Sequence, residues 1–142
     1  MPATQKQECV GLWLDQSGAT IVTLKSNDAD PVVRHVESGV ESHFRLSGGW
    51  KAGTQTQEVS NEKRIDRRRA QQLDRYYERL AEMLGDARRI LILGPGEAKL
   101  GLERALKAKR GSKPHRFTVK TADKMTENQL VADVRRFFAG KA

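Results

Sequence analysis

Residues 90–102 have the sequence ILILGPGEAKLGL, and this stretch decides the fold. Four consecutive apolar residues at 90–93 are typical of a strand that is covered on both faces. The Gly94-Pro95-Gly96 turn ends this strand, and a helix is expected from about 97 to 108 because apolar residues then recur on one helical face. A buried strand that leads directly into a helix predicts a parallel sheet in an α/β fold.

The same alternation of strand and helix continues on both sides of this stretch. Towards the C-terminus we expect a strand at 116–120 and a last helix that begins after a Thr126–Gln129 capping box. Towards the N-terminus we expect a helix at 63–84. Its apolar stripe consists of Leu73, Tyr76, Tyr77, Leu80 and Leu84.

The N-terminal part of the chain predicts three strands on short turns. Two strands lie within residues 9–25 and a third at 32–40, which favours an antiparallel meander. Residues 41–62 show no sustained period, so we predict a long flexible loop there. The order β-β-β-α-β-α-β-α predicts a single domain over 1–142, with a mixed five-stranded sheet and three helices in a ribonuclease-H-like arrangement.

Composition points to a polyanionic partner. The 142 residues include 26 Lys and Arg against 18 Asp and Glu, a formal net charge of +8. Such a balance favours nucleic acid or an anionic membrane surface. Cys9 is the single cysteine, so neither an internal disulfide nor a zinc-ligand set is predicted. With neither a signal peptide nor a membrane-spanning run in the sequence, we expect a cytoplasmic protein.

Three local motifs, in this order, resemble those of a known domain. They are HFRLSGG at 43–49, RIDRRRAQQLDRYYERL at 64–80 and ILILGPGEAKLGL at 90–102. The succession resembles the middle domain of the archaeal and eukaryotic class-1 peptide release factors and of Pelota, and it is similar to short bacterial proteins that carry this domain alone. The resemblance implies a partner in the ribosome, either rRNA or tRNA.

The chain departs from the release factors at one decisive point. Their loop carries Gly-Gly-Gln, whereas here Gly48-Gly49 is followed by Trp50. Gln55 and Gln57 lie further on without two preceding glycines. Peptidyl-tRNA hydrolysis is therefore not carried over from the resemblance, and we predict no catalytic residues.

The 63–84 helix carries a second, basic row that could follow a phosphate backbone over about 22 Å. Lys63 and Arg67 add to its first two turns. An ordinary solvated face is the alternative, because Glu78 and Glu82 could pair with the later arginines at i+3. The row consists of Arg64, Arg68, Gln71, Arg75 and Arg79.

The loop contributes the other expected nucleic-acid contacts: Arg45, Gly48, Gly49, Trp50 and Lys51. A tryptophan beside two glycines in a polar segment could stack on a base. It could equally fold back onto the sheet, and the sequence leaves both interpretations open.

An anion site is conceivable where the 90–93 strand meets the next helix, with Gly94, Gly96 and Lys99 as its residues. The spacing matches neither a Walker motif nor GxGxxG, and Glu97 would repel a phosphate. A structural tight turn is the alternative. The basic link from Lys107 to Arg116 is either a further phosphate contact or a solubilising patch.

A second function class is a metal-dependent nuclease or other hydrolase. Asp15 follows the first strand, and its conceivable partners are Glu37, Glu41 and Asp123. Asp15 in DQSG is more simply a turn residue. We therefore predict no metal and no cofactor, and a non-enzymatic RNA- or ribosome-binding protein. A protein-interaction adaptor is the third hypothesis, and the sequence makes no prediction of oligomeric state.

Overall fold

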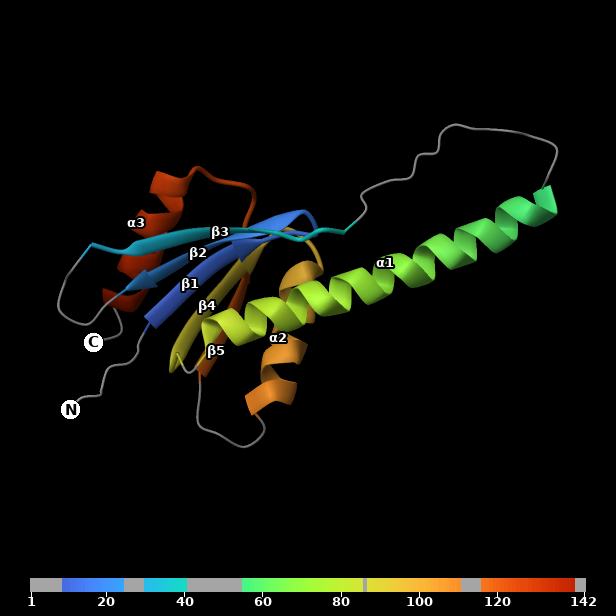
Figure 1. The fold of residues 1–142 in the computed structure, drawn as a ribbon. Helices are drawn as coiled ribbons and strands as arrows, with labels where there is room; N and C mark the ends of the chain where they lie inside the picture. The colour runs from blue at the N-terminus through green and yellow to red at the C-terminus, as the bar shows by residue number, and fades with distance from the viewer. Residues whose placement is uncertain (1–8, 25–29, 41–54, 86, 111–115, 140–142) are drawn as a thin grey trace.

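The computed structural model describes residues 9–24, 30–40, 55–85, 87–110 and 116–139, and it has an α/β fold (Figure 1). Within these ranges a mixed five-stranded sheet is packed with three helices, as the sequence predicts. The strand order is β3-β2-β1-β4-β5. The elements are β1 (Cys9–Leu14), β2 (Gly18–Leu24), β3 (Val32–Glu37), α1 (Gln55–Leu84), β4 (Arg89–Gly94), α2 (Ala98–Arg110), β5 (Arg116–Thr121) and α3 (Glu127–Ala139).

The sheet joins an antiparallel meander to a parallel half. β1 pairs with β2 and β2 with β3 in antiparallel register, whereas β1 pairs with β4 and β4 with β5 in parallel. The meander is possible because Asp15 closes a tight turn: its Oδ1 accepts the backbone N–H of Ser17 at 2.9 Å and of Gly18 at 3.1 Å.

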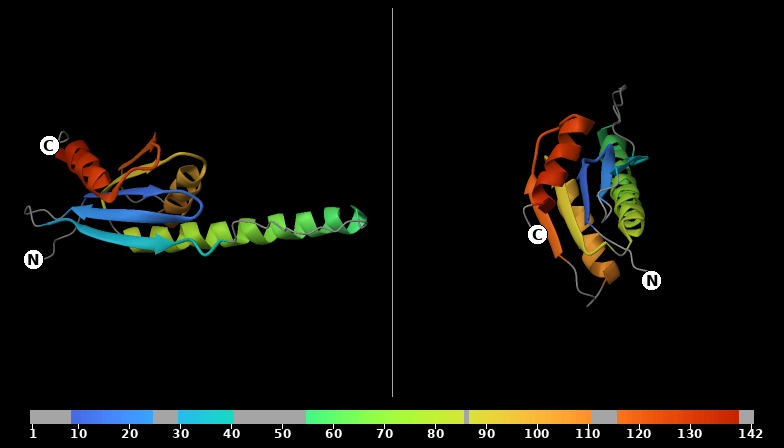
Figure 2. Two further views of the ribbon diagram at one scale, coloured as in Figure 1. Left: turned by 90° about the horizontal axis from the view of Figure 1, so that it is seen from above. Right: turned by 90° about the vertical axis from the view of Figure 1, so that its left-hand side faces the viewer.

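Helices cover both faces of the sheet (Figure 2). Ile90 and Ile92 of β4 point into the core beneath α1 and α2, and Leu91 and Leu93 point into the core beneath α3. This double burial explains the continuous apolar run of β4. Because its side chains alternate between the two faces, β4 contributes residues to both cores.

The predicted capping box of the last helix and the predicted end of the 63–84 helix at Gly85 are confirmed. Thr126 and Gln129 form the capping box of α3 reciprocally, with distances of 3.0 and 3.1 Å. Gly85 ends α1 at a φ of 57°, which favours glycine. Gly101 lets α2 approach α1, because a Cβ there would collide with the Tyr77 ring.

Two boundaries differ from the prediction by three residues or more. α1 begins at Gln55, so the prediction of a loop over 41–62 is wrong for residues 55–62; residues 41–54 lie outside the described residues. An apolar period reports packing, and this end of α1 projects beyond the sheet, where no such period is needed (Figure 1). The third strand ends at Glu37 instead of residue 40.

Candidate nucleic-acid interface

The N-terminal half of α1 extends well past the sheet (Figures 1 and 2). The helix has 30 residues, a length of about 45 Å. Among its described side chains, Leu73 is the first to pack on the core and Tyr76 the first to be fully buried. The turns before Leu73 therefore form a projecting arm, which we define as residues 55–72.

Four basic side chains on the projecting arm are exposed: Lys63, Arg64, Arg67 and Arg68. Spacings of three and four residues place them on adjacent faces of the same two turns. Asp66 lies between them and exposed Glu62 directly precedes them, so the cations of these two turns outnumber the acids. The arm thus presents a dense, solvent-accessible positive charge away from the body of the sheet.

Arg69 and Tyr76 attach the base of the projecting arm to the turn between β1 and β2. Arg69 Nη2 donates to Gln16 Oε1 at 2.8 Å, while its buried Nε has no hydrogen-bond partner. The Tyr76 hydroxyl donates to the Asp15 carbonyl at 2.9 Å, and burial raises the pKa of this hydroxyl above its ordinary range. Sequence reasoning missed Arg69, although its spacing to Leu73 and Tyr76 places it on the sheet-facing side.

The predicted arginine row does not act as one surface. Arg79 Nη2 donates to the carbonyls of Glu37 and Ser38, both at 3.1 Å, and so anchors the end of β3. Among the described residues no ion pair joins Arg75 or Arg79 to Glu78 or Glu82, so the alternative i+3 pairing is not formed. Exposed Arg75 and anchored Arg79 lie on the packed part of α1, apart from the arm.

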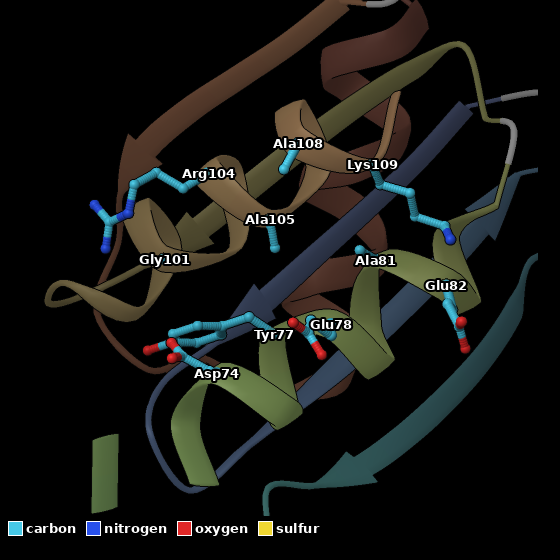
Figure 3. Close-up of a pocket in the computed structure, with 10 residues that line it drawn as sticks. All are labelled: Asp74, Tyr77, Glu78, Ala81, Glu82, Gly101, Arg104, Ala105, Ala108 and Lys109. Atoms are coloured by element: carbon cyan, nitrogen blue, oxygen red, sulfur yellow. The ribbon is translucent and has the colours of Figure 1, made fainter. Parts of the chain in front are cut away.

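An acidic groove runs along the packed part of α1 (Figure 3). It has a volume of about 470 Å³ and lies between α1 and α2. Asp74, Glu78 and Glu82 line the α1 side, opposite Arg104 and Lys109 of α2. The helix is therefore basic on its arm and carries acidic residues along this groove, so that of these two parts of α1 the arm is the one that favours a polyanion.

The residues expected to bind from the loop lie outside the described residues: Arg45, Gly48, Gly49, Trp50 and Lys51. Chain connectivity alone ties them to the arm, because the segment leads directly into Gln55.

The contacts of the turn between β4 and α2 favour a structural tight turn, the alternative to an anion site. Lys99 is buried, and its ammonium donates to the Gly96 carbonyl. Gly94 packs against β1 so closely that a Cβ would collide with the Leu14 carbonyl. The backbone carbonyl of Glu97 accepts the backbone N–H groups of Leu100 and Gly101 at 2.9 and 3.1 Å. These residues are thus engaged in holding the turn, and anion binding there stays a prediction.

Among the described residues, carboxylates do not converge around Asp15. Its Oδ1 is occupied by the turn, and the Asp123 carbonyl accepts the Trp13 indole N–H at 3.1 Å. Over the described part of the chain, no group of three His, Cys, Asp or Glu residues is placed to hold a metal ion. Glu41 lies outside that part. The turn interpretation of Asp15 is confirmed.

No described helix is both long enough and apolar enough to cross a membrane. Comparison with known protein families found no family model that matches the chain, and comparison with curated proteins gave no match.

Proposed function

We propose that this protein binds RNA, in the setting of the ribosome, through the projecting arm of α1. The observation that carries the proposal is the set of exposed cations Lys63, Arg64, Arg67 and Arg68 on a helix segment that extends beyond the sheet. Arginine side chains on successive helical turns suit phosphate oxygens, because guanidinium groups bind them in a fixed planar geometry.

The shape of α1 also fits the resemblance to the middle domain of release factors and Pelota. The motif at 64–80 begins on the arm and ends on the packed part, where Tyr76 and Tyr77 are buried. The HFRLSGG motif at 43–49 precedes the arm in sequence. A cationic arm can enter an RNA-lined site that the sheet is too wide to enter. A cytoplasmic location and a non-enzymatic role are parts of this proposal.

The test is a salt series of RNA and ribosome binding. We expect the double variant Arg64→Ala/Arg68→Ala to bind about tenfold more weakly at low salt, with a salt slope reduced by about two, because each phosphate contact releases condensed counterions. Fluorescence anisotropy with ribosomal RNA, together with co-sedimentation with ribosomes, measures both quantities.

The matched control is Arg34→Ala/Arg75→Ala, which removes two exposed arginines outside the arm. It should keep most of the affinity, and both double variants should stay within about 0.5 kcal/mol of the parent in thermal melts. Equal binding by the parent and the Arg64/Arg68 variant would refute the assignment of the arm.

A further inference from the structure

A second cluster of cations lies on the face of the sheet that α3 partly covers. Arg89 of β4 and Arg116 of β5 are Cα partners in the parallel register, about 4.8 Å apart across the sheet. Their neighbours Ile90 and Phe117 point into the core under α1 and α2, so both arginines point to the α3 side. Like charges directly opposite each other on neighbouring strands destabilise a sheet.

Aromatic rings lie against two cations of this face, Arg89 and Lys120, without neutralising them. The Arg89 guanidinium lies 5.6 Å from the centroid of the Phe138 ring, and Lys120 Nζ lies 5.1 Å from that of Phe137. The two rings pack edge to face, with centroids 4.9 Å apart. A cation over an aromatic face is attracted to the ring but keeps its full charge.

Among the described residues, no carboxylate lines the small cavity at this place. The cavity has a volume of about 30 Å³ and is lined by Arg89, Ile90, Arg116, Thr118, Phe137 and Phe138. In the described ranges no ion pair joins Arg89, Arg116 or Lys120 to an acidic residue. The space accommodates about one water-sized group, such as one oxygen of a phosphate, and it is too small for a metabolite.

We infer that this face, with Arg89, Arg116, Thr118 and Lys120, binds a phosphate group of an RNA backbone. Two guanidinium groups and a hydroxyl are donors that phosphate oxygens accept, and the phosphate charge would offset the repulsion between the arginines. Arg116 and Lys120 are four residues apart on one face of β5, about 13 Å. That spacing is too long for one small anion and suits an extended backbone.

This contact is separate from the arm. Arg89 and Arg116 begin β4 and β5, whereas the arm is attached at Gln16, beyond the carboxyl end of β1. Because β1, β4 and β5 are parallel, the Arg89/Arg116 pair lies at the opposite end of the sheet from the attachment of the arm. Protection of an exposed sheet edge would account for Lys120, but it does not account for two arginines held side by side. The identity of the ligand as RNA rests on the proposed function.

The test compares Arg89→Gln/Arg116→Gln with Arg34→Gln/Arg135→Gln, which removes the same charge from exposed positions on β3 and α3. Anisotropy with a labelled oligouridylate and with ribosomal RNA should show about tenfold weaker binding and a salt slope lower by about two for the first variant only. Arg89→Lys/Arg116→Lys keeps the charge and should recover most of the affinity, which separates a binding defect from a folding defect.

The two double variants test the arm and the sheet face separately. Loss of affinity in the Arg64/Arg68 variant with none in the Arg89/Arg116 variant overturns this inference and leaves the proposed function standing. The opposite pattern refutes the arm and supports the sheet face. If parent protein binds no RNA, both fail. If inorganic phosphate shifts the Arg89 and Arg116 side-chain NMR signals while RNA affinity is unchanged in the variant, the face is a small-anion site and the RNA assignment is wrong.

Discussion

Tyr76 combines full burial with a polar contact that positions the arm. Its hydroxyl donates to the Asp15 carbonyl at 2.9 Å, and burial is the main reason that its pKa is raised. We expect Tyr76→Phe to lower the free energy of unfolding by about 1 kcal/mol, because the carbonyl loses its partner. Urea unfolding at neutral pH measures this change.

The same residue predicts a pH dependence. A folded-state pKa above the unfolded value of about 10 means that folding favours the protonated hydroxyl. The stability that this proton provides is complete below pH about 10 and is lost as the pH rises further. Tyr76→Phe should make the alkaline loss shallower.

Tyr77→Phe is the matched control for the hydrogen bond. Burial raises the pKa of Tyr77 as well, but no described hydrogen bond involves its hydroxyl. Its neutral-pH cost should be smaller than that of Tyr76→Phe. Equal costs in the two variants would show that the Asp15 contact contributes nothing.

Among the elements, β3 depends on α1 for its attachment at one end. Ser38 N donates to the Ser17 carbonyl at 2.9 Å, and Arg79 bonds the Glu37 and Ser38 carbonyls from outside the strand. We expect Arg79→Ala to cost about 1 kcal/mol after allowance for solvent exposure, and to speed hydrogen exchange at the Ser38 amide.

Arg75→Ala is the control that distinguishes the carbonyl contacts of Arg79 from the effect of its charge alone. Arg75→Ala removes the same charge one turn earlier on α1, and it should leave stability and exchange nearly unchanged. If the two alanine variants melt alike, the carbonyl contacts of Arg79 do not anchor the edge strand.

Periodicity predicted the packed elements well and the arm poorly. Leu73, Tyr76 and Leu80 have a core to face, so their spacing revealed the helix. The helical residues 55–62 show no apolar period in the sequence, so that part of α1 gave no signal. The strand register explains why the sequence did not predict the Arg89/Arg116 pair. Arg89 and Arg116 are far apart in sequence, and only the β4–β5 pairing brings them together.

At the scale of the whole molecule, the exposed basic residues of the arm were predicted from sequence because charge is visible there directly. The sequence already set Arg64 and Arg68 apart from Arg75 and Arg79, through possible pairing with Glu78 and Glu82. It could not supply the contact of Arg79 to the end of β3, because that contact requires the tertiary structure. The ribonuclease-H-like assignment and the role of Trp50 stay predictions.

The last prediction concerns what the intact protein does once it is bound. The motif that ends in glutamine in release factors has Trp50 after Gly48-Gly49 here. Indole can stack on a base but cannot position a water molecule as a carboxamide can. We therefore expect binding to programmed ribosomes with no release of labelled peptide above background. The positive control is a release factor that carries Gly-Gly-Gln. Peptide release that disappears in a Gly48→Ala/Gly49→Ala variant would show that this loop hydrolyses peptidyl-tRNA without the glutamine, and the protein would then be an enzyme.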